Sequence, residues 1–134
     1  MDWRQSTAPN LAEFERLASE AWGRLPGDFR ALCRDVIVRI EDFAPDDVLD
    51  ELGIESPFDL MGLYQGVSLN RKSVMDAPRE PDMVFLYRRA ILDYWAEHEE
   101  TLGNLVTHVL VHEIGHHFGF SDADMQRIEA DAQG

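Results

Sequence analysis

Residues 101–119, TLGNLVTHVLVHEIGHHFG, are the stretch that decides the fold. They predict the longest helix of the chain, which begins at the first or second of these residues and ends at Phe118. Gly119 follows at the position where helices commonly end in a left-handed residue. The pattern H-E-x-x-H occupies residues 112–116 near the end of this helix. The same helix is therefore expected to organise both the fold and the chemistry.

The two histidines of this pattern lie on one face of the predicted helix. At 100° per residue, His116 is about 40° from His112 and one turn further along, so both imidazoles can bind one zinc ion. Glu113 lies about 100° from His112, too far round to be a natural third ligand. It is well placed to take a proton from a zinc-bound water, whose pKa the metal lowers.

A catalytic zinc site needs a third protein ligand and one open position. His108 continues the histidine stripe, but it lies roughly 12 Å from His116 along the helix axis. Zinc–nitrogen bonds of about 2 Å cannot span that distance. His117 points about 100° away from His116. Asp122 is the better candidate, because Gly119 lets the chain reverse after the helix. We expect His108 and His117 to pack, or to orient a neighbouring ligand.

The longer pattern H-E-x-x-H-x-x-G-x-x-D resembles the zinc signature of the metzincin metallopeptidases. It resembles more closely a family of small bacterial zincin-like metallopeptidases, as do GLYQGV at 62–67 and LYRR at 86–89. The resemblance covers most of the chain from about Phe29 onward. It implies a minimal zincin that uses Zn²⁺ to hydrolyse a peptide or protein, with Glu113 as catalytic general base on zinc-bound water. The metal ligands that it implies are His112, His116 and Asp122.

The sequence departs from the metzincin pattern after the third ligand position. A metzincin has a methionine-containing turn well beyond that ligand, whereas few residues follow Asp122 here. Met125 is close enough to sit beneath the site, and we expect Met125, Phe118 and Phe120 to form its apolar floor. From the small size we expect no counterpart of the C-terminal subdomain that forms one wall of a typical metzincin cleft.

Outward from this helix, hydrophobic periodicity predicts an α+β fold, a short sheet of about three strands packed with helices. We expect one zincin-like domain over residues 1–134. Alternating or β-branched runs predict strands at 36–43, 60–69 and 83–87. Helical spacing predicts further helices at 11–25, 29–34, 45–52, 88–97 and 121–132. Ser121 is expected to cap the last of them, with Asp124 three residues on completing an approximate capping box. Residues 71–81 are predicted to be a polar loop. The larger side chains expected to face inward from the short helices are Phe29, Leu32, Cys33, Ile91, Leu92 and Trp95.

Composition limits the classes of partner and the compartment. The chain has 26 acidic and 12 basic residues and a formal charge of −14, so nucleic acids and anionic membranes are not expected partners. The lone Cys33 fits a reducing compartment, and we expect it to be a buried, inert thiol. No signal peptide and no membrane span are visible, so the cytoplasm is the expected location.

Three functional hypotheses remain open on these residues. The first is a zinc-dependent metalloendopeptidase. The second is a non-catalytic zinc module that binds a protein partner through its acidic surface. The third is a chain that retains the fold and has lost the metal. A histidine–histidine–carboxylate set also suits iron(II) and other divalent ions. Tyr64 and Tyr87 have hydroxyls that could face a developing oxyanion, although core packing is the favoured interpretation of both.

Overall fold

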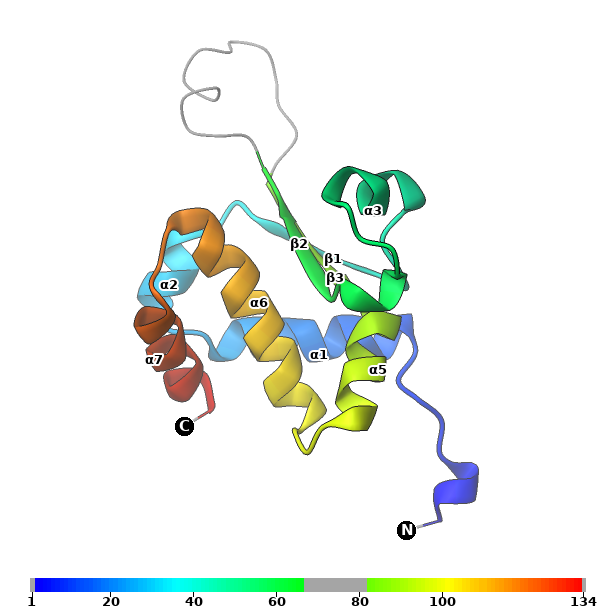
Figure 1. The fold of residues 1–134 in the computed structure, drawn as a ribbon. Helices are drawn as coiled ribbons and strands as arrows, with labels where there is room; N and C mark the ends of the chain where they lie inside the picture. The colour runs from blue at the N-terminus through cyan, green and yellow to red at the C-terminus, as the bar shows by residue number, and fades with distance from the viewer. Residues whose placement is uncertain (1, 67–81, 134) are drawn as a thin grey trace.

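A three-stranded mixed sheet organises the fold of residues 2–66 and 82–133, which the computed structural model describes (Figure 1). Its strands are β1 (Ile37–Glu41), β2 (Gly62–Gln65) and β3 (Met83–Tyr87). The spatial order is β1-β3-β2, with β1 parallel to β3 and β2 antiparallel to it. β3 is therefore central, and no other strand of the described residues pairs with the outer edge of β2.

The described helices confirm the predicted α+β class. The α-helices are α1 (Leu11–Arg24), α2 (Gly27–Leu32), α3 (Asp46–Leu52), α5 (Arg88–Glu97), α6 (Leu102–Phe118) and α7 (Asp122–Gln133). Two 3₁₀ turns that the sequence did not predict are η1 (Trp3–Gln5) and η2 (Pro57–Asp59). Each predicted helix lies within two residues of its observed bounds. The end signals explain this agreement, because Gly119 closes α6 with a left-handed φ of 78°.

Alternate residues of β3 face two different apolar clusters. Val84 and Leu86 are fully buried in the main core, which α1, α6 and α7 also line. Tyr87 faces the opposite side of the sheet, where it packs with Leu49 of α3 and Ala90 of α5. This alternation is the two-residue period of a strand that is covered on both faces. The main core lies between the sheet and α6, the helix that carries the H-E-x-x-H pattern.

Three predictions about the outer elements need correction. The predicted strand at 60–69 is shorter, since β2 covers four residues, and its predicted end at 67–69 lies outside the described residues, as does the predicted loop at 71–81. Leu32 is 55% exposed, because the short α2 buries only Phe29. Trp95 is 36% exposed, because α5 buries residues only in its first turns.

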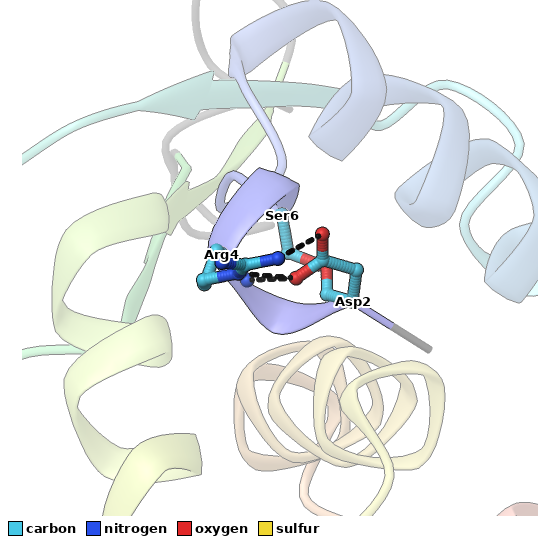
Figure 2. A network of polar contacts seen from close by, with 3 residues as sticks. All are labelled: Asp2, Arg4 and Ser6. Carbon is cyan, nitrogen blue, oxygen red and sulfur yellow. Dashed lines mark hydrogen bonds and ion pairs between the residues drawn. The ribbon is translucent and has the colours of Figure 1, made fainter.

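The N-terminal turn η1 is held by exposed polar contacts (Figure 2). The Arg4 guanidinium lies 3.1 Å from a carboxylate oxygen of Asp2, and the Ser6 hydroxyl donates to the Asp2 carbonyl over 3.5 Å. Exposed ion pairs add little to stability, so this turn does not determine the fold. No helix in the described part of the chain is long and apolar enough to cross a membrane.

Cys33 is buried, as the sequence predicted. Its side chain is 1% exposed, and burial raises the pKa of the thiol to about 11. A thiol with so high a pKa is almost entirely protonated at neutral pH, so it is a poor nucleophile and a poor metal ligand.

Candidate metal centre

α6 is a long helix because its ends are capped and its inner face is apolar. The Thr101 hydroxyl accepts a hydrogen bond from the backbone N–H of Asn104 over 3.2 Å, which satisfies one of the free donors at the helix start. The buried residues of α6 are Leu105, Val106, Thr107, Val109, Leu110, Val111, Ile114 and Gly115. The histidines lie beside this buried face, so the core fixes the direction in which they point.

His112 and His116 are neighbours on α6, one helical turn apart. Their ring centroids are 5.7 Å apart, and the ring planes meet at 86°. The His112 side chain is 25% exposed, and His116 is exposed. Two imidazoles this close on one helix face can reach a common ion after small side-chain rotations.

Glu113 lies on the flank of α6 that faces β2. A Cβ placed on Gly62 would lie 2.7 Å from Val109 Cγ1 and 3.2 Å from Glu113 Cγ. Only a glycine lets β2 approach this flank so closely. Gly62 therefore brings the edge strand into contact with the glutamate of the H-E-x-x-H pattern.

The Glu113 carboxylate reaches the outer edge of β2. The Met61 carbonyl accepts a hydrogen bond from the Tyr87 N–H over 2.9 Å, so Met61 directs its backbone groups towards β3. Backbone direction alternates along a strand, and Gly62 and Tyr64 therefore direct theirs outward. Glu113 accepts a hydrogen bond from the Tyr64 backbone. The carboxylate thus lies where a further strand would pair with β2.

Burial raises the pKa of the Glu113 carboxyl above its ordinary value. The positive charge of His116 and the hydrogen bond from the Tyr64 backbone act in the opposite direction and lower that pKa. Desolvation is the largest of these effects, because it removes the water that would stabilise the charged form. A carboxyl with a raised pKa binds a proton more readily near neutral pH, as a general base must.

Asp122, the predicted third ligand, is the first residue of α7 and is exposed. Within residues 2–66 and 82–133, the only group of three or more potential metal ligands close to one another does not include it. The local structure here is a helix start, where Ser121 and Asp124 form the predicted reciprocal cap with bonds of 3.1 and 3.4 Å. Asp122 as a metal ligand stays a prediction.

The group that the structure does bring together is His108, His112 and Glu129, whose candidate ligand atoms all lie within 4.8 Å of one another. His108 Nδ1 lies 2.6 Å from Glu129 Oε1, and His112 Nε2 lies 3.3 Å from Glu129 Oε2. Sequence reasoning missed Glu129 altogether. The sequence analysis rejected His108 as a ligand together with His116, because the two lie roughly 12 Å apart along the helix axis, and expected it to pack or to orient a neighbouring ligand.

The packing of α7 on α6 explains how Glu129 reaches the histidines. Met125 is fully buried, and its sulfur would lie 2.4 Å from a Cβ placed on Gly115. α7 therefore returns along α6, as Figure 1 shows, with Met125 beside Gly115. Glu129 follows Met125 by four residues, so it lies on the same face of α7, one turn nearer the start of α6. That position is beside His112 and His108.

A second polar cluster joins β2 to the end of α6. The Tyr64 hydroxyl donates to Asp82 over 2.8 Å, and the His117 ring stacks on Tyr64 with centroids 3.8 Å apart. Burial, followed by the hydrogen bond to Asp82, raises the pKa of Tyr64. His117 thus packs on an aromatic ring rather than facing His116. Tyr87 is 1% exposed, which confirms the packing interpretation of that tyrosine.

Comparison with known proteins bears on the same residues. A family model described as "Zincin-like metallopeptidase" matches residues 33–132, well over half of the chain. The matched segment includes the sheet, α6 and nearly all of α7. No match is found among curated proteins.

Proposed function

The chain belongs to the zincin-like metallopeptidase family, and we propose that it is a zinc-dependent metallopeptidase with Glu113 as its general base. The observation that carries the proposal is the placement of Glu113. Its partly buried carboxylate lies beside the His112–His116 pair and at the outer edge of β2. This placement supports a site made of a proton acceptor, a histidine pair that would bind the metal, and a strand edge.

The donor set suits zinc. We propose that His112, His116 and Asp122 hold the ion, two imidazoles and a carboxylate being a common set in catalytic zinc sites. Zinc, when bound, lowers the pKa of a coordinated water and polarises a carbonyl. His112 and His116 already lie one helical turn apart with rings near each other. Asp122 would have to turn towards them from the start of α7.

Glu113 supplies the proton transfer in this proposal. Its carboxylate takes a proton from the attacking water and later gives that proton to the leaving amine. The raised pKa serves both steps, because the carboxyl gains the proton readily and remains acidic enough to release it.

The outer edge of β2 gives the proposed peptide substrate a place to bind. The backbone groups of Gly62 and Tyr64 point away from β3, so an extended peptide can pair with them as an added strand. Such a strand would compete with Glu113 for the hydrogen bond from the Tyr64 backbone. Substrate binding would then release the carboxylate for proton transfer.

The test is a peptide-library cleavage assay on zinc-loaded wild-type chain, Glu113→Gln and Glu100→Gln, followed by mass spectrometry. Glu100 is an exposed glutamate just before α6, which makes it a matched control. We expect Glu113→Gln to bind as much zinc as the wild type and to lose cleavage, while Glu100→Gln cleaves normally. Cleavage by Glu113→Gln at the wild-type rate would contradict the proposal.

A non-catalytic zinc module is the second candidate, and Glu129 is the observation that favours it. Its carboxylate already lies 3.3 Å from His112 Nε2, so it could act as a further protein ligand and close the position that water needs. The formal charge of −14 would then serve to bind a basic partner. A zinc-loaded wild type that cleaves no peptide in the library would support this candidate.

A further inference from the structure

We infer that His108, His112 and Glu129 form a second divalent-cation site, which shares His112 with the proposed zinc site and therefore competes with it. The inference rests on the proposed function only for the consequence of that competition. The site itself rests on side chains that α6 and α7 bring together.

The geometry resembles a metal site because one carboxylate faces two imidazoles. Glu129 Oε1 lies 2.6 Å from His108 Nδ1, and Glu129 Oε2 lies 3.3 Å from His112 Nε2. The rings of His108 and His112 are 4.0 Å apart between centroids, closer than those of His112 and His116. The three donor atoms need move only slightly to surround an ion with bonds of about 2 Å.

The donor set is chemically suited to borderline divalent ions. Two imidazoles and one carboxylate bind Zn²⁺, Co²⁺ and Fe²⁺, and they leave positions open for water. The Glu129 side chain is 13% exposed, so its carboxylate is largely withdrawn from solvent. Both of its oxygens face imidazole nitrogens, and a cation between the two rings would be bound by these nitrogens and by the carboxylate together.

The packing of α7 on α6 holds Glu129 in this position. Met125, one turn before Glu129, is fully buried against Gly115 of α6. Ile128, next to Glu129, also packs on the main core. Because these contacts fix the register of the two helices, Glu129 does not depend on the metal to reach the histidines. The site is thus largely formed before an ion arrives.

Sharing of His112 makes the two sites mutually exclusive. A neutral imidazole has only one ring nitrogen with a lone pair available to a metal, so His112 can bind one ion, either with His108 or with His116. An ion held with His108 and Glu129 leaves His116 without its histidine partner. The relative affinity of the two sites then sets the fraction of chains that are active. Weakening the His108–Glu129 site would shift the ion towards His116.

The test isolates the second site by removing His116. Metal-free wild type, His112→Ala, His116→Ala, and His116→Ala combined with Glu129→Gln, His108→Ala or Asp131→Asn are titrated with Co²⁺, and the visible absorption is followed. Asp131 is an exposed carboxylate two residues from Glu129, so its variant is the matched control. Thermal unfolding of each metal-free variant checks that the fold is kept.

We expect His116→Ala to bind one equivalent of Co²⁺ with absorption bands different from those of the wild type. Adding Glu129→Gln or His108→Ala should raise the dissociation constant at least about tenfold, since even indirect partners of metal ligands have effects of that size. Adding Asp131→Asn should leave it unchanged. Equal effects of Glu129→Gln and Asp131→Asn, or His116→Ala binding no tighter than His112→Ala, would overturn the inference.

This binding experiment separates the inference from the proposed function. Co²⁺ binding to His116→Ala requires no hydrolysis, so a chain that cleaves nothing can still bind the ion through Glu129. That result would overturn the proposed function alone. A wild type that cleaves peptides, together with a His116→Ala variant that binds no Co²⁺, would overturn the inference alone.

Discussion

Two glutamates flank the histidine stripe of α6, and their surroundings differ. Glu113 lies on the flank that faces β2, where burial raises its pKa and the Tyr64 backbone hydrogen-bonds to it. Glu129 approaches the other flank from α7 and lies within 3.3 Å of two histidine nitrogens. One carboxylate is thus held beside a strand edge, and the other beside potential metal ligands.

The difference shows how surroundings assign distinct roles to the same residue type. A carboxylate with a raised pKa beside the outer edge of a strand is suited to move a proton. A carboxylate between two imidazoles is suited to share a cation. The close approach of β2 to Glu113 depends on Gly62, and the position of Glu129 depends on the packing of Met125. Each flank of α6 can therefore be altered separately.

The largest expected effect separates the two glutamates by hydrolysis. Glu113→Gln should lower kcat by about 10²–10⁴-fold, the usual contribution of a general base. Glu129→Gln should keep hydrolysis per bound zinc at or above the wild-type value, because it removes the competing site. Both rates are measured on one fluorogenic peptide chosen from the library. A loss in Glu129→Gln as large as that in Glu113→Gln would make Glu129 a ligand of the catalytic ion.

The thermal stability of the metal-free chain tests the surroundings of Glu113. A raised carboxyl pKa in the folded chain means that ionised Glu113 is destabilising above that pKa, and that the penalty disappears as pH falls below the ordinary value. Metal-free Glu113→Gln should therefore unfold at the same or a higher temperature than the wild type at pH 7. A lower unfolding temperature would show that the Tyr64 hydrogen bond outweighs desolvation.

A substitution on the flank of α6 that contacts α7 should lower stability more than one on the flank that contacts β2. Met125→Ala removes a fully buried side chain, so we expect a loss of about 2–5 kcal/mol in the free energy of unfolding. Urea denaturation measures it, with the exposed neighbour Gln126→Ala as control. The same variant should weaken Co²⁺ binding through Glu129, because α7 loses its register. A loss no larger than that of Gln126→Ala would contradict the packing described.

On the sheet flank, Gly62→Ala places a methyl group 2.7 Å from Val109 Cγ1 and 3.2 Å from the Phe85 carbonyl. Backbone cannot move aside easily, so we expect a loss of about 1–3 kcal/mol in the free energy of unfolding. Hydrolysis should fall as well, since β2 is pushed away from Glu113. Gly23→Ala is the control, because a Cβ there meets nothing within 4 Å. Equal stabilities of the two variants would show that Gly62 is not needed for the close approach.

The smallest effect concerns the start of α7. Ser121→Ala removes the hydroxyl that accepts a hydrogen bond from the Asp124 backbone N–H at the start of α7. We expect a loss of about 1 kcal/mol in the free energy of unfolding. Hydrogen bonds from Ser121 lower the pKa of Asp124 in the folded chain. The ionised carboxylate therefore contributes its full stabilisation at pH values above the ordinary pKa, and this stabilisation is lost as the pH falls through the lower pKa of the folded chain. The difference in unfolding temperature between Ser121→Ala and the wild type should therefore become smaller at acidic pH. Thermal unfolding measures this difference, with the exposed Ser19→Ala as the control variant.

Much of the fold could be predicted because its signals are local. Gly119 and Thr101 mark the ends of α6, and the Ser121–Asp124 cap was read from spacing alone. The prediction that Leu32 and Trp95 face inward was wrong, because an apolar residue on a short helix can face solvent. Hydrophobic spacing within one helix does not show how far the neighbouring helix covers it.

The candidate site was predicted only where it lies on one helix. His112, Glu113 and His116 share α6, so their spacing fixes their relative directions. Glu129 was missed because its position depends on how α7 packs on α6, a tertiary contact between Met125 and Gly115. Hydrophobic spacing predicts that a helix exists but leaves open which face of another helix it meets.

Zinc-dependent hydrolysis is the central claim, and chelation followed by metal return tests it most directly. The purified chain is assayed on the peptide library with its zinc content measured, then after chelator treatment, and again after one equivalent of Zn²⁺ is restored. We predict cleavage that disappears with the zinc and returns with it, and no cleavage by Glu113→Gln at any stage. Cleavage that survives complete removal of metal, or a fully zinc-loaded chain that cleaves no peptide, would contradict the claim.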